Sequence, residues 1–288
     1  MKKTPAVSSY CGSTSKGYIY IAKLSNTGSW QWVKTAGGST LGPFINDIQS
    51  LNNSIYIAGS FDACTNGLSI STPITSTANF GSYYFTATSR CFSAGSGISC
   101  GGFTRAFVAK ISDTGTWSGL INTSGERTQV GGTNPPTKLS LDSDGTNLFM
   151  AGQFSSQSWS MKFGNFVLPS SGSSSFYSKF NQNLVYSKSM IIGGTADQVN
   201  CPLFHSTNGT KWISGQYVGD FMIDNTSYVR SVSGEVFINI DSNLTPLKMI
   251  DFTGPNSIEP CRAIGLGTKA SSNYVIIDDG QGFTIGST

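Results

Sequence analysis

The stretch Asp142-Ser-Asp-Gly-Thr-Asn147 carries side-chain oxygens at alternate positions, as loops that bind Ca²⁺ do. Asp142 and Asp144 are the acidic ligands that such a metal site would use. The stretch lacks the third acidic position and the more distant glutamate of a calcium loop. It also has the composition of a polar hairpin turn. The sequence therefore favours a turn, keeps a metal site as the alternative, and predicts no cofactor.

Candidates for acid–base catalysis are few. His205 is the one histidine of the chain, and no acidic residue lies beside it in the sequence to make it a general base. Asp278 and Asp279 are adjacent carboxylates, whereas glycoside hydrolysis needs two carboxylates that face one substrate. Adjacent residues of a strand point to opposite faces. We therefore predict no catalytic residues and a protein that is not an enzyme, with a glycoside-acting hydrolase as the least favoured alternative.

Tryptophan side chains can stack on sugar rings. Trp30 and Trp117 occupy the same place in two similar segments, which indicates packing between repeats. Trp159 lies instead in the variable polar stretch 155–160, and it is the one tryptophan that is a candidate ligand contact, while the sequence does not identify the binding residues.

The chain has six cysteines and no Cys-x-x-Cys pair, so with a single histidine it offers little support for a zinc site. An even number of cysteines in a low-charge chain rich in Ser and Thr fits disulfides formed in an oxidising compartment. Cys91 and Cys100 bracket a short segment and are the candidate disulfide. The alternative is that all six are buried free thiols.

The composition excludes several classes of partner. Only 11% of the 288 residues are charged, the net charge is +3, and there is no run of Lys and Arg, so we expect no nucleic-acid partner. Aromatic residues, at 12%, supply material for a core. No apolar run approaches the length of a membrane span. The N-terminus begins with two lysines, but no apolar segment follows them, so we predict no signal peptide.

One segment of the chain occurs four times. Ala106-Phe-Val-Ala-Lys-Ile-Ser-Asp-Thr-Gly-Thr-Trp117 has the pattern of a strand, a tight turn and the start of a second strand. Tyr20-Ile-Ala-Lys-Leu-Ser-Asn-Thr-Gly-Ser-Trp30 is a close copy, and residues 176–183 and 236–243 are looser ones. The copies align at Lys23, Lys110, Lys179 and Asn239. Four copies of one hairpin indicate a repeat protein, in which the lysine recurs as architecture.

Short segments rich in β-branched and aromatic residues, bounded by Gly, Asn, Asp or Ser, fill the rest of each repeat. No window has the apolar 3.6-residue period of a convincing helix. The sequence thus predicts an all-β protein with four or five short strands per repeat. Insertions at residues 62–79, 88–102 and 126–136 interrupt the pattern. Insertions in repeat proteins form loops, often on a binding face, although they can also be variation without function.

The repeats span roughly residues 10–85, 103–168, 173–228 and 234–288, preceded by an N-terminal segment. Residues 282–288 match the first half of the last short piece of the repeat, and residues 5–12 fit its second half. Ends that supply complementary halves favour a closed ring, which hides edge strands. We predict one domain over residues 1–288. It is a β-propeller of four blades, each of four or five short antiparallel strands, closed by the N- and C-terminal strands in one blade.

The pattern Phe-Val-Ala-Lys-Ile/Leu-Ser-x-x-Gly-x-Trp is followed by Gly-Gly, then Ile-Tyr-Ile-Ala-Gly-Ser-Phe and Phe-Gly. It resembles the SBBP-type β-propeller repeat, most closely over residues 20–61 and 107–154. The resemblance implies a propeller of a family common in bacterial surface and secreted proteins and also found in proteins of large viruses. It implies no shared enzymatic activity and no catalytic residues.

Together these features predict a non-catalytic, surface-exposed β-propeller that acts as a protein- or glycan-interaction module. The expected location is extracellular or on the surface of a virion. The expected partners are proteins or surface glycans, with no nucleic acid and no membrane span. The alternative is a structural subunit of a virus particle or of another extracellular assembly.

Overall fold

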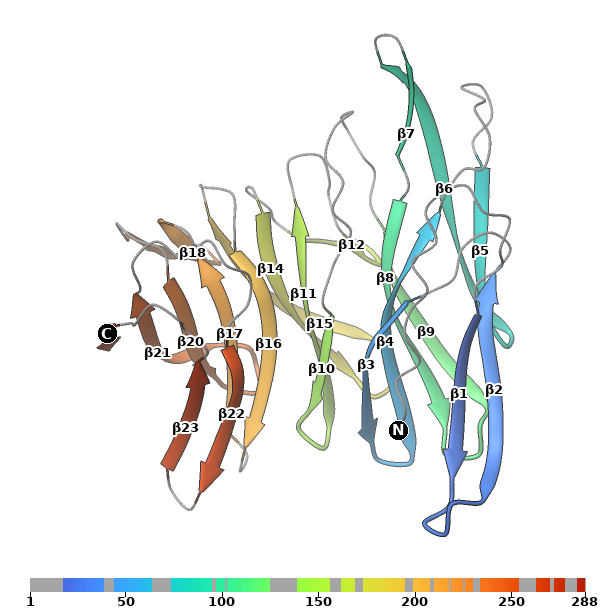
Figure 1. Cartoon of the computed structure of the whole chain (residues 1–288), viewed down its shortest axis with the longest axis horizontal. Helices are drawn as coiled ribbons and strands as arrows, with labels where there is room; N and C mark the ends of the chain where they lie inside the picture. Colours follow the sequence, from blue (N-terminus) through green and yellow to red (C-terminus); the bar gives the residue numbers. More distant parts are fainter. Residues whose placement is uncertain are drawn as a thin grey trace. The chain divides into compact units, whose positions relative to one another are not determined.

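The structure is a computed structural model of the whole chain, and the regular elements in its described residues are all β-strands (Figure 1), which confirms the all-β prediction. The described residues are 18–38, 44–63, 74–94, 97–101, 103–124, 139–155, 162–168, 173–194, 199–207, 210–217, 219–224, 226–229, 234–253, 263–269, 272–277 and 284–287. Within them, no helix is long and apolar enough to cross a membrane.

The strands belong to two compact units. The first unit comprises Met1–Thr123 and Gln129–Pro135, and the second comprises Ser124–Thr128 and Pro136–Thr288. The strands up to the end of the first unit are β1 (Tyr18–Leu24), β2 (Trp30–Gly38), β3 (Phe44–Leu51), β4 (Ser54–Ala63), β5 (Ile74–Phe80), β6 (Tyr83–Ala94), β7 (Gly97–Gly101), β8 (Phe103–Ser112) and β9 (Trp117–Ser124).

The second unit contains the remaining strands. They are β10 (Ser140–Ser143), β11 (Asn147–Ser155), β12 (Lys162–Phe163), β13 (Phe166–Val167), β14 (Ser173–Asn181), β15 (Tyr186–Gly194), β16 (Val199–Thr207), β17 (Thr210–Tyr217), β18 (Phe221–Ile223), β19 (Thr226–Tyr228), β20 (Gly234–Ile240), β21 (Pro246–Thr253), β22 (Ala263–Lys269), β23 (Ser272–Ile277) and β24 (Thr284–Ser287).

Most strands form hairpins of three kinds, which recur in a fixed order along the chain. The four copies found in the sequence form the central hairpins β1–β2, β8–β9, β14–β15 and β20–β21. Each is followed in the chain by a leading hairpin, and these are β3–β4, β10–β11, β16–β17 and β22–β23. A trailing hairpin comes next, and these are β5–β6, β12–β13 and β18–β19, with the single strand β24 in the fourth position.

The antiparallel sheets collect these hairpins from separate stretches of chain. The first unit contains the orders β1-β2-β5-β6-β7 and β3-β4-β8-β9, and the second contains β10-β11-β14-β15-β18-β19, β16-β17-β20-β21-β24 and the isolated pair β22-β23. A complete sheet thus contains a leading, a central and a trailing hairpin, in that order. The sequence predicted four or five strands per blade. The second unit instead contains sheets of five and six strands, because a leading hairpin joins the central hairpin of the following repeat.

All four central hairpins turn through the same five-residue loop. In the first, the Ser25 amide donates to the Ser29 carbonyl over 2.8 Å, and the Gly28 amide donates back to Ser25 over 3.0 Å. The turn that starts at Ser112 repeats these bonds, and Asn181 and Asp241 start the other two turns with equivalent ones. The looser copies in the sequence are therefore the same hairpin, with an Asn or Asp side chain in place of the serine.

The fourth residue of this loop adopts a left-handed backbone conformation. It is Gly28 (φ 83°) and Gly115 (φ 82°) in the first two hairpins, but Leu184 (φ 62°) and Leu244 (φ 59°) in the others. A non-glycine residue in this conformation costs about 1–2 kcal/mol. Both leucine side chains are buried, and burial of a leucine stabilises by a similar amount, about 1.5–3 kcal/mol.

The first residue of the fourth turn is ionisable. The Asp241 side chain accepts hydrogen bonds from the backbone amides of Thr245 (2.8 Å) and Asn243 (2.7 Å). These bonds hold the pKa of Asp241 below its ordinary value, because they favour the charged carboxylate. The Asp241 carboxylate thus stabilises the folded state at pH values above the pKa that this group has in the unfolded chain. The stabilisation is lost as the pH falls through the pKa of Asp241 in the folded protein.

In the first unit, the apolar face of β8 and β9 packs on the sheet that contains β1, β2 and β5. The Phe80 ring lies 5.1 Å from the ring of Phe107 and 5.2 Å from that of Trp117, the latter edge-on. Ile19 and Ile21 belong to the same buried cluster. This contact buries Trp117, which packs between repeats as predicted, whereas the equivalent Trp30 is 69% exposed.

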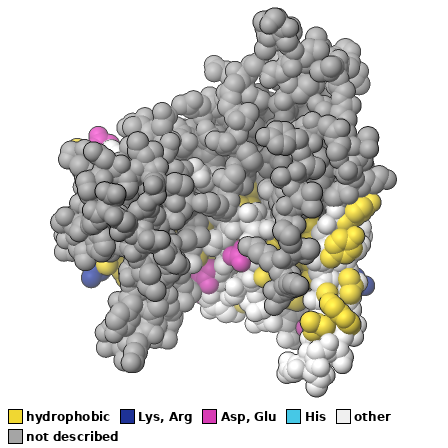
Figure 2. Space-filling view, in the orientation of Figure 1, with side chains coloured by type: hydrophobic (Ala, Val, Ile, Leu, Met, Phe, Trp, Pro, Cys, Tyr) yellow, Lys and Arg dark blue, Asp and Glu magenta, His cyan; other side chains and the backbone are white. Residues whose placement is uncertain are grey.

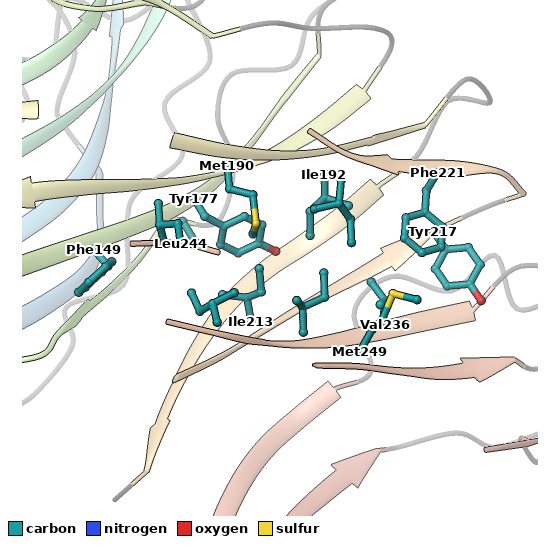
Figure 3. Close-up of a cluster of buried hydrophobic side chains, with 14 residues drawn as sticks. Phe149, Tyr177, Met190, Ile192, Ile213, Tyr217, Phe221, Val236, Leu244 and Met249 are labelled. Atoms are coloured by element: carbon teal, nitrogen blue, oxygen red, sulfur yellow. The ribbon is translucent and has the colours of Figure 1, made fainter. Parts of the chain in front are cut away.

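The second unit repeats this packing between its six-stranded and five-stranded sheets. Figure 3 shows Tyr177, Met190 and Ile192 of one sheet facing Ile213 and Val236 of the next. The buried Tyr177 hydroxyl donates a 2.7 Å hydrogen bond to the Ser214 carbonyl of the facing sheet, and burial raises the pKa of Tyr177. The Tyr177 hydroxyl thus adds a specific polar contact to the apolar interface between these sheets.

The turn of β8–β9 generates the first testable prediction. A Cβ on Gly115 would lie 2.9 Å from Trp32 Cδ2 and 3.0 Å from Lys34 Cε, whereas a Cβ on Gly145, which has the same backbone conformation, would meet nothing within 4 Å. Gly145→Ala should cost about 1 kcal/mol of unfolding free energy from backbone strain alone. Gly115→Ala should cost at least about 1 kcal/mol more, because it adds overpacking.

Urea unfolding of both variants measures this difference. Equal destabilisation of Gly115→Ala and Gly145→Ala would show that the turn does not pack against β2 as described.

Candidate functional site

The largest departure from the repeat is in the trailing hairpin of the first unit. Strand β6 has 12 residues, and it continues past its pairing with β5 to pair with the additional strand β7. The trailing strands β12 and β13 have two residues each, and β18 and β19 have three each. We refer to residues 90–101 as the arm. Figure 1 shows β6 and β7 reaching beyond the other strands of their unit.

The arm falls within the predicted insertion 88–102, which thus contains a β-hairpin extension. The predicted insertion 62–79 includes the first residues of β5, and its residues 64–73 lie outside the described part of the chain. The predicted insertion 126–136 also lies outside it.

The register of the arm places Cys91 and Cys100 directly opposite each other on β6 and β7. Directly opposed residues of an antiparallel pair have Cα atoms about 4.5–5.5 Å apart, which is within the range that a disulfide spans. The backbone is therefore compatible with a bridge between these two cysteines, and the bridge itself stays a prediction.

The acidic stretch 142–147 forms the turn between β10 and β11, as the sequence favoured. Its two aspartates have different partners. Asp144 Oδ1 accepts the backbone amides of Thr146 (2.9 Å) and Asn147 (2.6 Å). Burial alone would raise the pKa of Asp144, but these hydrogen bonds outweigh it and lower that pKa. Asp144 thus stabilises the turn as a charged carboxylate.

Asp142 pairs instead with Lys211 on β17. The Lys211 Nζ atom lies 2.5 Å from Asp142 Oδ2, donates to the Ser143 carbonyl over 3.2 Å, and sits 4.4 Å from the centre of the Phe149 ring. Both charged side chains are largely buried. A metal at Asp142 would have to compete with this ammonium group. Among the described residues, no group of three or more His, Cys, Asp and Glu could hold a metal ion.

The recurring lysine links neighbouring central hairpins. Lys23 Nζ lies 2.5 Å from Asp113 Oδ1, in the turn of the next central hairpin, and Trp32 Nε1 donates to the Asp113 carbonyl over 2.9 Å. Lys179 reaches the corresponding turn in the second unit, with its Nζ atom 3.4 Å from Asn243 Oδ1. These contacts hold successive hairpins together, which agrees with the architectural role predicted for the lysine.

The side chains of the other sequence candidates lie outside the described part of the structure. His205 lies in β16, and its backbone partner is Trp212 of β17; its side chain is outside the described set. Trp159, Asp278 and Asp279 also lie outside the described residues.

The sequence did not predict the exposed apolar face of the first central hairpin. This face, formed by Tyr20, Leu24, Trp30 and Val33, is called the β1–β2 face below. Figure 2 shows hydrophobic side chains along the margin where β1 and β2 lie in Figure 1. Tyr20 is 68% exposed and Trp30 is 69% exposed, whereas the equivalent Phe107 and Trp117 are 0% and 9% exposed. Because the four copies look alike in sequence, no local signal distinguishes this face.

Comparison with known proteins adds no relative from which a function could be transferred. No protein-family model matches the chain, and neither a curated protein nor a solved structure does.

The cysteine register gives a prediction for the arm. Peptide mapping of the protein, purified without reductant and blocked with an alkylating reagent, should recover Cys91 and Cys100 in one disulfide-linked peptide. Reduction should then destabilise the arm by about 2 kcal/mol, because the bridge restricts the unfolded loop. Recovery of both cysteines as alkylated thiols would rule the bridge out.

The buried ion pair gives a second prediction. Lys211→Met should lower the free energy of unfolding by about 3 kcal/mol, because it leaves the Asp142 carboxylate buried without its cation. Adding Asp142→Asn should recover part of this loss, because it removes the stranded charge. Denaturant titration of the two variants checks both values. A loss for Lys211→Met that Asp142→Asn does not reduce would show that the two groups are not coupled.

Proposed function

We propose that this protein is a non-catalytic interaction module that binds a protein or a surface glycan through its arm. The observation that carries the proposal is that one trailing hairpin is much longer than its counterparts in other repeats. In β12–β13 and β18–β19 this hairpin has strands of two or three residues. In the first unit, β5 has seven residues and β6 has 12, and β6 also pairs with the five-residue β7. Binding residues are concentrated on loops and extensions that a rigid scaffold positions.

The partners of the acidic side chains support a non-catalytic role. Asp113 and Asp142 are paired with lysines, while Asp144 and Asp241 accept backbone amides of their own turns. A catalytic carboxylate instead needs access to substrate and a second acid or base beside it. Asp142 and Asp144, the acidic candidates within the described residues, thus hold strands and turns.

The fold proposed for this module is the closed four-bladed β-propeller. The recurrence of leading, central and trailing hairpins in the four antiparallel sheets supports it. In the fourth repeat, β24 pairs with β21 as a lone trailing strand. We propose that residues 5–12 supply the second strand beside it, so that both ends of the chain complete one blade.

We propose that the protein is extracellular or lies on the surface of a virion. The opposed cysteines of the arm suit an oxidising compartment. The resemblance to the SBBP-type repeat fits an extracellular or virion-surface protein.

A specific observation favours a second function, that of a structural subunit in a virion or another extracellular assembly. The β1–β2 face exposes Tyr20, Leu24, Trp30 and Val33 side by side. A contiguous exposed apolar patch of this kind usually marks a contact with another protein surface. In this alternative, copies of the protein associate and the arm carries no ligand.

Replacement of residues 90–101 by Asn-Gly tests the arm. Asn-Gly suits a two-residue hairpin turn, so the chain can still reverse direction after the shortened β6. The intact protein should bind a defined glycan on an array or a protein on cells in flow cytometry, and the variant should lose at least about tenfold in affinity at an unchanged melting temperature. The matched control, Phe166→Ser, alters a trailing hairpin that lacks an arm and should bind as the intact protein does.

Undiminished binding by the arm-deleted variant would overturn the proposal. If the intact protein binds no ligand and sediments as a regular oligomer, the structural-subunit alternative is correct.

A further inference from the structure

The arm is poor in the residue types that usually recognise a polar ligand. Residues 90–101 contain no Asn, Gln, Asp, Glu, Trp or Tyr. Nine of these 12 residues are Gly, Ala, Ser or Cys, and the other three are Arg90, Phe92 and Ile98. Ligand sites usually combine aromatic residues with a few precisely placed polar groups. Because small residues shield the backbone little, the backbone itself is the main source of binding groups that the arm offers.

Strand β7 is the last strand of its sheet in the described part of the chain. Its five residues pair with β6 in one uninterrupted register, from Gly97 opposite Ala94 to Gly101 opposite Arg90. Figure 1 shows the two strands reaching beyond the others of their unit. Every second residue of an edge strand directs its N–H and C=O groups away from the sheet. The outer side of β7 is thus a row of backbone donors and acceptors.

Several other edge strands have features that discourage the addition of a further strand. Strands β19 and β24 end their sheets with only three and four residues. Strands β3 and β16 are longer, but their registers are interrupted between Ile45 and Asp47 and between Asn200 and Leu203. Strand β16 also contains Pro202. Short edge strands, bulges, charged residues and proline all protect sheet edges. Strand β7 has five residues, no charged residue, no proline and no break in its register.

The arm has a second edge, on the side of β6 that faces β5. Ser89, paired with Ile74, is the last residue of β6 that β5 covers. The uncovered part of β6 begins with Arg90, and a charged residue on an edge strand discourages pairing. The outer side of β7 is therefore the edge of the arm that suits an added strand.

We propose that the arm binds an extended segment of a partner protein, which pairs with the outer side of β7 and adds one strand to the sheet. This inference rests on the proposed function and identifies the partner as a protein. Hydrogen bonds between the two backbones supply the affinity, and the alternating side chains of the segment supply specificity. A glycan has no row of N–H and C=O groups at the spacing of a strand, so it does not match this edge.

A library of short linear peptides displayed on phage is the probe for this edge. The library is first depleted on the variant in which residues 90–101 are replaced by Asn-Gly, and it is then selected on the intact protein. We expect peptides that bind the intact protein and lose at least about tenfold in affinity for the arm-replaced variant. The Phe166→Ser variant, which retains the arm, should bind these peptides as the intact protein does.

Methylation of the peptide backbone separates strand pairing from contacts made by side chains. Each selected peptide is synthesised in two forms, with N-methyl groups on one or the other set of alternate amides, so that each form blocks one side of the strand. One form should lose at least about tenfold in affinity, because it loses several backbone hydrogen bonds, and the other should bind nearly as the unmodified peptide does. Equal affinities of the two forms would overturn the pairing.

Amide hydrogen exchange of the intact protein locates the bound segment. In the free protein, every second amide of β7 should exchange fast, because it has no partner strand on the outer side. With a selected peptide bound, these amides should exchange at least about tenfold more slowly, whereas those of β19 should not change. Unchanged exchange of β7 in the complex would also overturn the pairing.

The outcomes separate this inference from the proposed function. If no arm-dependent peptide is selected, the inference is wrong, and a defined glycan that still binds through the arm would leave the proposed function in place. Binding of a glycan or a cell-surface protein that the arm replacement does not weaken would overturn the proposed function itself. Dimers of the intact protein that the arm replacement abolishes would assign the β7 edge to a second copy of the chain and overturn a separate partner.

Discussion

The structure depends on pairing of the first strand of a central hairpin on both sides, which the described residues show for β8, β14 and β20. A strand in the middle of a sheet satisfies its amide and carbonyl groups on both sides, and an unpaired buried backbone group is costly. In the first unit β8 lies between β4 and β9, and in the second β14 lies between β11 and β15. This requirement explains why the sheets draw their hairpins from separate stretches of the chain. Each repeat is thereby tied to the next by backbone hydrogen bonds as well as by packing.

Side-chain contacts then fix the spacing between successive sheets. The turn of β8–β9 receives Lys23 and Trp32 at Asp113, and Gly115 is needed there because the Trp32 ring leaves no room for a Cβ. In the second unit the corresponding contact is made at Asn243, and the Tyr177 hydroxyl adds a bond across the apolar interface. Lys23, Asp113 and Asp142, whose side chains could have been read as chemistry, thus hold sheets in register.

Local signals predicted the hairpins but not their partners. The strand class, the tight turn of the repeated hairpin and the turn at residues 142–147 follow from residue types at short spacing, and the structure contains all three. An insertion separates β4 from β8 in the chain, so no periodicity in the sequence indicates that these strands pair. Similarly, the sequence offered Asp142 as a metal candidate because it gives no sign of the ion pair with Lys211, which lies 69 residues away. The opposed positions of Cys91 and Cys100 were within reach of sequence reasoning, because the segment between them is short enough to form one hairpin.

The most direct test of this architecture is amide hydrogen exchange along the first strands of the central hairpins. If β8, β14 and β20 are paired on both edges, consecutive amides of each strand should all exchange slowly, at rates set by global unfolding. A strand paired on one edge would protect only every second amide, because successive N–H groups point to opposite sides. Fast exchange at alternate residues of β8, for example at either Val108 or Ala109, would contradict the pairing of leading and central hairpins.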